Sequence, residues 1–220
     1  MWPDLRLVIF DCDGVLVDSE TISNRVLAQM LRVEGLPTTL EQSRSEYQGL
    51  LLADIRIQAE RKLGRALPQD WLARYEAERD LVFIHELQPV AGAANAVRQV
   101  TEAGIRVCVA SQSKPSKIAL SLTLTGLDEL FPQNARFSSY AVARGKPAPD
   151  VFLHAAASMD VEPDGCVVVE DSPSGVTAAV SAGMRVLGYA ADSDEHALRQ
   201  AGATEILRSL EELPRVLGLS

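Results

Sequence analysis

The chain has 220 residues, of which 47% are apolar and 23% are charged, and its formal net charge is −9. It is longer than one average domain, too short for two large ones, and too apolar to be largely disordered. The acidic balance disfavours a nucleic-acid polymer as the main partner, because neutralising phosphates requires a basic face.

The first element is a short apolar run at residues 5–10, which predicts a buried parallel strand that ends at Asp11-Cys12-Asp13-Gly14. From residue 19 to residue 86 the pattern becomes helical. One helix ends at Gly35-Leu36-Pro37, and further helices are expected at about 40–47, 51–63 and 69–86. Nothing in this span predicts a strand.

Beyond residue 90, helical and strand patterns alternate, with strands expected at residues 105–110, 136–138, 166–169, 185–189 and 204–206. Such alternation is typical of βαβ units and a parallel sheet. We therefore predict an α/β fold: a doubly wound, Rossmann-like parallel sheet with an all-helical cap inserted after the first strand. Residues 1–18 and 87–220 would form the core domain, and residues 19–86 the cap.

Polar residues follow several of the predicted strands. The carboxyl ends of parallel strands meet at one edge of a sheet, where ligands bind. The residues expected at that edge are Asp11 and Asp13, Ser111, Glu170 and Asp171, and Lys146 in a Gly-Lys-Pro loop.

The four carboxylates at this edge would repel one another, by roughly 4 kcal/mol per pair at 4 Å and an effective dielectric of 20. A hard cation such as Mg²⁺, bound through oxygen, would offset this. Alternatively, Asp11 and Asp13 only form a turn, as Asp-Gly pairs usually do. An EF-hand is excluded because Gly14 is the fourth residue of the motif and follows a strand.

Ser111 and Lys146 suit an anionic ligand. Ser111 lies where a strand leads into a helix, so its hydroxyl and nearby amides could hold phosphate, although Ser111 or Ser113 could instead cap the helix. Lys146 could hold a nucleophilic carboxylate and offset phosphoryl charge, or could be a solvated loop cation. Asp150 is expected to cap a helix or support the lysine loop.

Taken together and in order, four segments resemble the four motifs of the haloacid dehalogenase superfamily. They are Phe10-Asp11-Cys12-Asp13-Gly14-Val15-Leu16-Val17-Asp18-Ser19-Glu20, Val109-Ala110-Ser111, Gly145-Lys146-Pro147-Ala148-Pro149-Asp150 and Val169-Glu170-Asp171-Ser172. The chain is most similar to the beta-phosphoglucomutase-like phosphatase branch, in which a helical cap interrupts the chain after the first motif.

The resemblance implies a role for each matching residue. Asp11 would be the nucleophile that forms an aspartyl-phosphate, and Asp13 the general acid and then the base. The phosphate would contact Asp11, Cys12, Asp13, Ser111, Gln112 and Lys146. Lys146 would also orient Asp11. Mg²⁺ would be held by Asp11, the carbonyl of Asp13, Asp171 and, directly or through water, Glu170.

The resemblance implies a phosphatase of a small metabolite, such as a sugar phosphate, sugar-acid phosphate or nucleotide. Asp13 and Glu170-Asp171 separate the chain from metal-free dehalogenases. A phosphomutase of the same branch typically has a His twelve residues after the nucleophile and an Arg in a cap loop. Here those places hold Ser23 and the loop 48–52, which has no Arg. The cap cations that could substitute are Arg44, Arg56 and Lys62.

A phosphate-binding regulatory module is the non-enzymatic alternative. The cap is expected to close over the cleft, with candidate pivots at Gly49 and near Asp18 and Pro89, while residues 50–52 are expected to pack in the cap core.

The sequence shows no signal core, no membrane-length apolar run and no metal-ligand spacing among Cys12, Cys108 and Cys166. We therefore expect a cytoplasmic protein, a monomer or weak homodimer, with reduced, buried cysteines and no membrane partner.

Overall fold

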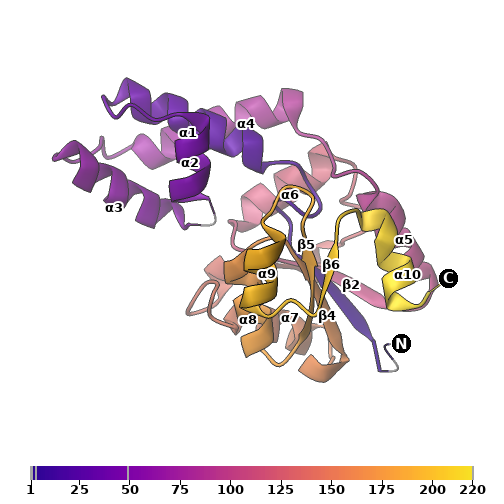
Figure 1. The fold of residues 1–220 in the computed structure, drawn as a ribbon. Coiled ribbons are helices and arrows are strands. Elements are labelled where there is room, and N and C mark those ends of the chain that lie inside the picture. The colour runs from indigo at the N-terminus through magenta and orange to yellow at the C-terminus, as the bar shows by residue number, and fades with distance from the viewer. Residues whose placement is uncertain (1, 3, 49, 220) are drawn as a thin grey trace. The chain divides into compact units, whose positions relative to one another are not determined.

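The computed structural model describes residue 2 and residues 4–48 and 50–219. The chain forms two compact units: one comprises Met1–Val17 and Pro89–Ser220, and the other Asp18–Gln88 (Figure 1). The cap was predicted at residues 19–86, so the boundaries of the inserted unit lie one and two residues from the predicted ones. The candidate pivot Gly49 lies outside the described residues.

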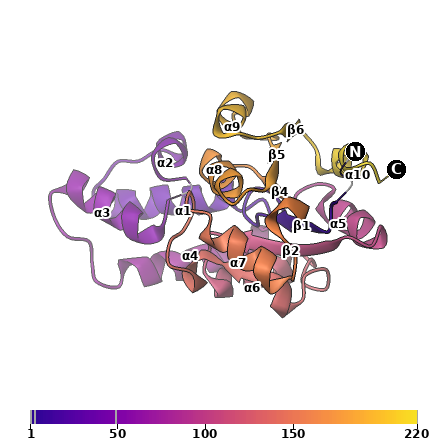
Figure 2. The same cartoon turned by 90° about the horizontal axis from the view of Figure 1, so that it is seen from below.

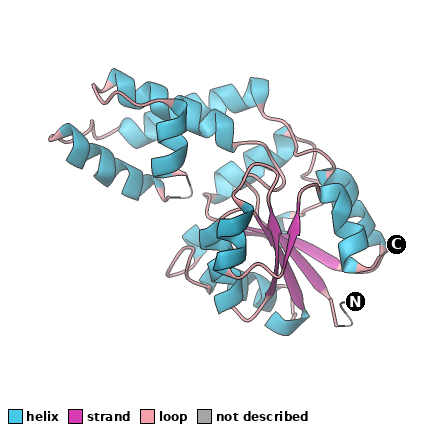
Figure 3. Ribbon diagram, viewed as in Figure 1, coloured by secondary structure: helices cyan, strands magenta, loops and turns pink. Residues whose placement is uncertain are grey.

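The first unit contains a six-stranded sheet in the order β3-β2-β1-β4-β5-β6, in which each neighbouring pair is parallel. The strands are β1 (Leu7–Phe10), β2 (Arg106–Ser111), β3 (Arg136–Ser138), β4 (Cys166–Glu170), β5 (Arg185–Tyr189) and β6 (Glu205–Leu207). All the strands among the described residues belong to this unit (Figure 3). The predicted doubly wound parallel sheet is confirmed.

The central strands are apolar throughout because helices cover both faces of the sheet. One face packs its side chains, among them Ile9, Ala110 and Val168, against α7 (Asp150–Ser158) and α8 (Pro173–Ser181). Next to α8 lies α9 (Glu195–Ala201) (Figure 2). The crossovers from β1 to β3 use α5 (Ala93–Glu102) and α6 (Pro115–Leu124), and α10 (Leu213–Leu217) packs on α5.

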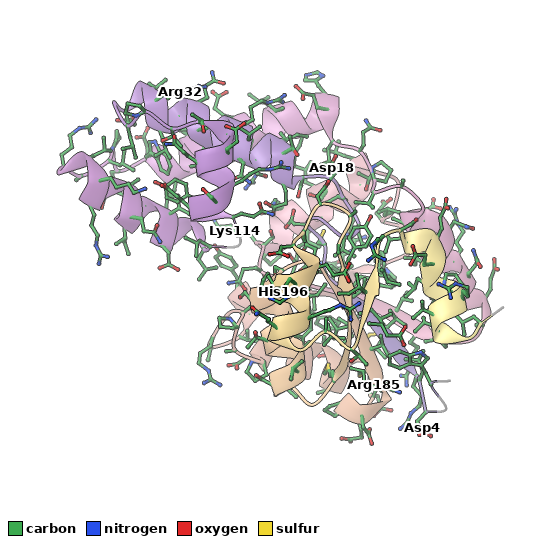
Figure 4. All side chains as sticks on the ribbon, in the orientation of Figure 1. Asp4, Asp18, Arg32, Lys114, Arg185 and His196 are labelled. Atoms are coloured by element: carbon green, nitrogen blue, oxygen red, sulfur yellow. The ribbon has the colours of Figure 1, made fainter. Side chains whose placement is uncertain are left out.

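The strand register aligns the ends that carry the candidate residues. Phe10, the last residue of β1, lies opposite Val109 of β2 and Val169 of β4. The amino ends lie at the opposite edge, where Asp4 precedes β1 and Arg185 begins β5, while Lys114 follows β2 at the carboxyl edge (Figure 4). The chain therefore leaves β1, β2 and β4 at one edge of the sheet, at Asp11, Ser111 and Glu170.

The inserted unit is helical over its described residues: α1 (Glu20–Val33), α2 (Leu40–Tyr47), α3 (Leu52–Leu63) and α4 (Trp71–Glu86). Its largest fully buried side chains are those of Trp71, Tyr47, Phe83 and Leu31. The prediction that residues 50–52 pack in the core of this unit is wrong for Leu50, which is 37% exposed, while Leu51 and Leu52 are half-buried. These residues form the turn into α3, with Leu51 at the N-cap in an extended conformation, so their side chains cannot all face inward.

All three cysteines are buried and unpaired, as predicted. Among the residues that the structure describes, no helix has both the length and the apolar character needed to cross a membrane.

Candidate active site

Asp11 is fixed at the end of β1. Its backbone amide donates to the carbonyl of Val169 in the neighbouring strand at 2.9 Å, and the residue is only 6% exposed. The chain then turns, and the amide of Gly14 donates to the carbonyl of Val17. Gly14 has a φ of +80°, which favours glycine. The Asp-Gly pair therefore does form a turn, and this turn places two carboxylates at the edge of the sheet.

Lys146 contacts residues of the three other sequence motifs. Its Nζ donates to Oδ1 of Asp11 at 2.5 Å, to Oε1 of Glu170 at 2.6 Å and to the carbonyl of Ala110 at 3.1 Å. Only 5% of the side chain is exposed, and Nζ lies 4.8 Å from the centre of the Phe152 ring. The alternative that Lys146 is a solvated loop cation is therefore wrong.

The protonation of Asp11 and Lys146 is set by burial and by their mutual contact. Burial raises the pKa of Asp11 to about 7. The charge of Lys146 opposes this rise, and the charges of Glu170 and Asp13 add to it. Burial by itself lowers the pKa of Lys146, but the charges of Asp11 and Glu170 and the hydrogen bonds to them outweigh burial, so this pKa is raised. Lys146 is consequently a permanent cation at neutral pH, and Asp11 is poised between its two forms.

Glu170 uses both carboxylate oxygens on protein partners. Oε1 accepts from Lys146, and Oε2 accepts from the backbone amide and the hydroxyl of Ser172, both at 2.9 Å. The hydroxyl oxygen of Ser172 in turn accepts from the amide of Gly175 and caps α8. A Cβ atom on Gly175 would lie 1.7 Å from Oε1 of Glu170, so only glycine leaves room for this carboxylate.

Asp13 is held by two residues of the segment that follows β2. The hydroxyl of Ser113 donates to Oδ2 at 2.6 Å, and Nζ of Lys117 donates to Oδ1 at 2.7 Å. Lys117 also donates to Oγ of Ser113 at 3.2 Å. Lys117 was not among the residues predicted from the sequence. The available signal was its helical spacing of four residues from Ser113, together with the scarcity of lysine: three of the four lysines in the chain, Lys114, Lys117 and Lys146, follow the strands of the core.

Ser111 is 1% exposed, and its Oγ accepts from the amide of Ser113 at 3.1 Å. The N-cap residue of α6 is Lys114, without a side-chain cap, so neither Ser111 nor Ser113 caps this helix. The Cys12 thiol is buried, and burial, with the charges of Asp13 and Asp11, raises its pKa well above the usual range. Any contact of Cys12 with a phosphate would therefore be made by its backbone.

The loop that carries Lys146 is supported from two sides. Asp150 begins α7 and pairs with Arg144 at 3.0 Å, which agrees with the supporting role predicted for it. The side chain of Gln112 accepts a hydrogen bond from the backbone amide of Lys146 at 2.9 Å. Gln112 was predicted to contact phosphate, and the structure shows that its side chain contacts the lysine loop.

Asp171 lies directly against the turn after β1. A Cβ atom on Gly14 would come within 2.2 Å of Oδ2 of Asp171, so the glycine makes room for this carboxylate. Within the described part of the chain, no three His, Cys, Asp or Glu side chains are grouped so that they could enclose a metal. Mg²⁺ does not require such a cage, since it keeps several waters and binds through one or two carboxylates and substrate phosphate. Asp11, Asp171 and the carbonyl of Asp13 fit that donor set.

Comparisons with known proteins show which family the chain matches. Residues 5–183 match the family profile of the haloacid dehalogenase-like hydrolases. Among curated relatives, a 6-phosphogluconate phosphatase of Escherichia coli is 32% identical over 86% of this chain and 84% of its own. A phosphorylated carbohydrates phosphatase of Thermotoga maritima is 31% identical over 97% and 98%. A beta-phosphoglucomutase of Bacillus subtilis is 29% identical over 84% and 83%.

Among solved structures, a haloacid dehalogenase-like protein of unknown function from Agrobacterium tumefaciens superposes with a TM-score of 0.83 at 33% identity. The match covers 97% of this chain and 98% of that one.

Proposed function

The chain belongs to the haloacid dehalogenase-like hydrolase family, and from this premise we propose that it is a Mg²⁺-dependent phosphatase that works through an aspartyl-phosphate. It is a phosphoric monoester hydrolase that acts on phosphorylated sugars or related metabolites. The observation that carries the proposal is the contact of the buried Lys146 ammonium with Oδ1 of Asp11 and Oε1 of Glu170. This contact fixes Oδ1 of Asp11, and we propose that the other oxygen, Oδ2, is the one that attacks the substrate.

In the first half-reaction, Oδ2 of Asp11 attacks the phosphorus atom of the substrate. The Asp11–phosphorus bond forms while the bond from phosphorus to the leaving alkoxide breaks, and protonated Asp13 gives its proton to that alkoxide. Lys146 offsets negative charge beside the nucleophile throughout this step. We propose that the hydroxyl of Ser111 and the amide that follows it hold the phosphoryl oxygens.

In the second half-reaction, a water molecule attacks the phosphorus atom of the aspartyl-phosphate. Asp13, now a carboxylate, takes a proton from that water while the bond between phosphorus and Oδ2 of Asp11 breaks. Inorganic phosphate leaves, and both aspartates return to their starting forms. Ser113 and Lys117 hold Asp13 at the place from which it serves both steps.

When bound, Mg²⁺ supplies positive charge for the substrate phosphoryl group and the nucleophile. Asp11, the carbonyl of Asp13 and Asp171 are the groups that we propose hold it. Glu170 has both oxygens on Lys146 and Ser172, so we assign it the support of Lys146 and no direct bond to the ion.

We propose a phosphorylated sugar or sugar acid as the substrate, because relatives are named for 6-phosphogluconate and for phosphorylated carbohydrates. Another relative is named for pseudouridine-5'-phosphate, so nucleotides belong in the substrate test. A phosphomutase must hold a bisphosphate by its second phosphate. The inserted unit's candidate cations are already engaged there: Arg56 pairs with Glu60, Lys62 pairs with Glu46, and Arg44 donates to Thr21. These contacts favour hydrolysis over mutase activity. The expected oligomeric state, cytoplasmic location and lack of nucleic-acid and membrane partners stay predictions.

The test is phosphate release from a panel of sugar phosphates, sugar-acid phosphates and nucleotides, together with acetyl phosphate. We expect turnover that requires Mg²⁺, is abolished by EDTA and is lost in Asp11→Asn. The matched control is Asp164→Asn, which removes an exposed carboxylate at the amino end of β4, away from the site. Phosphate release by Asp11→Asn at the rate of Asp164→Asn would refute the proposal. Conversion of a hexose 1-phosphate to the 6-phosphate, activated by a bisphosphate, would establish the mutase instead.

A further inference from the structure

We propose that the side chain of Gln112 is a positioning residue for Lys146, and that it acts on catalysis through the lysine loop and not through substrate. This inference rests on the proposed role of Lys146 beside Asp11. Gln112 directly follows Ser111, the last residue of β2, so it lies between the predicted phosphate site and the lysine loop.

The first observation is a hydrogen bond that runs toward the loop. Oε1 of Gln112 accepts from the backbone amide of Lys146 at 2.9 Å, across 34 residues of sequence. The ammonium end of the same lysine is held by Asp11, Glu170 and the carbonyl of Ala110. Lys146 is therefore held at both ends, and Gln112 is the side chain that fixes its backbone end.

The second observation is the residue that precedes the lysine. A Cβ atom on Gly145 would lie 2.7 Å from Nε2 of Gln112 and 2.9 Å from its Oε1. Gly145 is not among the residues with a positive φ, so its backbone conformation does not by itself require glycine. Its lack of a side chain leaves room for the amide of Gln112 to lie flat against the loop.

These contacts matter because Lys146 must reach two carboxylates at once. Its Nζ lies within 2.6 Å of oxygens on both Asp11 and Glu170, and a shift of the loop by a fraction of an ångström would weaken both contacts. An electrostatic group that acts on a transition state must be held in place before the reaction, because its value depends on not having to reorganise.

The experiment uses two substitutions at one position. Gln112→Met keeps the size of the side chain and removes the acceptor, whereas Gln112→Glu keeps an acceptor oxygen at the same reach. We expect Gln112→Met to lower kcat on acetyl phosphate about tenfold, with little change in KM. This is less than the roughly 10²–10³ for loss of a group that acts on the transition state directly, because Gln112 acts through Lys146. We expect Gln112→Glu to retain kcat and to raise KM, since it adds a negative charge near an anionic substrate. Gln99→Met, at an exposed position of α5, is the matched control.

A double-mutant cycle separates the two roles. If Gln112 acts through Lys146, then Gln112→Met should change kcat by less than about twofold in a Lys146→Met background, because the two residues act as a unit. Gly145→Ala should reproduce the kcat loss of Gln112→Met. Amide exchange of the Lys146 N–H, followed by NMR, should be faster in Gln112→Met than in wild type and unchanged in Gln99→Met.

Two results would overturn the inference: a folded Gln112→Met protein with unchanged kcat and unchanged Lys146 amide exchange, or a loss that is fully additive with Lys146→Met and is expressed in KM. If Gln112→Met does not fold, the inference would be overturned by a fall in the kcat of Gln112→Glu to the level of Lys146→Met. Failure of the proposed function is a separate result, because in that case Lys146→Met itself would leave kcat unchanged.

Discussion

Replacement of Lys146 by methionine is the perturbation for which the structure gives the sharpest expectation. The side chain keeps its length and apolar stem but loses the ammonium group, which lies between two carboxylates whose side chains are 9% and 1% exposed. Removing one partner of a buried ion pair costs about 3–5 kcal/mol, because the remaining charge is buried without compensation. Protonation of Asp11 would remove much of this destabilisation, since the pKa of Asp11 is already raised to about 7.

The loss of stability in Lys146→Met should therefore depend on pH. The cation lowers the pKa of Asp11, so its removal moves that pKa further up. At pH 6 Asp11 is then protonated and only Glu170 is left without the cation, so the loss is smaller than at pH 8. At pH 8 it approaches about 3 kcal/mol, which is roughly 6–12 °C in Tm for a chain of this size. Activity should fall by about 10²–10³ in kcat, the typical cost of one preorganised electrostatic group.

The assay pairs thermal melts in EDTA at pH 6 and pH 8 with initial rates of acetyl phosphate hydrolysis in Mg²⁺. Lys62→Met is the matched control, because Lys62 pairs with Glu46 at a site where both side chains are about 40% exposed, and such pairs contribute under about 1 kcal/mol. A folded Lys146→Met protein with kcat within about threefold of wild type, or with the same loss of stability at both pH values, would refute the reasoning.

Three further outcomes are expected. Burial raises the pKa of Asp11 from its ordinary value near 4 to about 7, so the folded state holds a proton that the unfolded state releases between these values, and stability falls as pH rises through this window. Asp11→Asn should thus melt above wild type in EDTA at pH 8 and gain less at pH 5, and equal gains would contradict this. Lys117→Met removes a hydrogen bond to Asp13. It should lower kcat more for an alkyl phosphate than for acetyl phosphate, because only the alkoxide needs a proton to leave. Equal losses on both substrates would argue against a role of Lys117 through Asp13. Gly175→Ala should lower both Tm and kcat, because the Cβ of alanine would meet Glu170. Without this clash, alanine in place of glycine would stabilise the helix by about 1 kcal/mol. A higher Tm would therefore show that Glu170 can move aside.

The sequence predicted the sheet well because the signals for its strands are local. β1 and β4 are continuous apolar runs that end in carboxylates, a pattern typical of strands buried on both faces. The same runs located Asp11 and Glu170 at strand ends, and the Gly-Lys-Pro loop located Lys146. What each of these residues contacts was set by the docking of segments far apart in the chain.

Lys117 shows why the rest could not be predicted. It contacts Asp13 across 104 residues, and only the way in which α6 docks on the sheet decides that this face of the helix meets the turn after β1. A bound cation was expected to relieve the repulsion between the carboxylates, whereas Lys146 and Lys117 supply part of that relief. The prediction that Leu50 packs in the core was wrong for a related reason, since an apolar residue in a turn need not face a core.

The central claim is that Asp11 carries the phosphoryl group during turnover. Quenching the enzyme during acetyl phosphate hydrolysis with hydroxylamine would convert an aspartyl-phosphate to a hydroxamate, which peptide mass spectrometry can locate. We expect a hydroxamate on Asp11 that requires both Mg²⁺ and substrate and is missing from Asp11→Asn. Turnover with the adduct on another residue, or sustained turnover in Asp11→Asn, would contradict it.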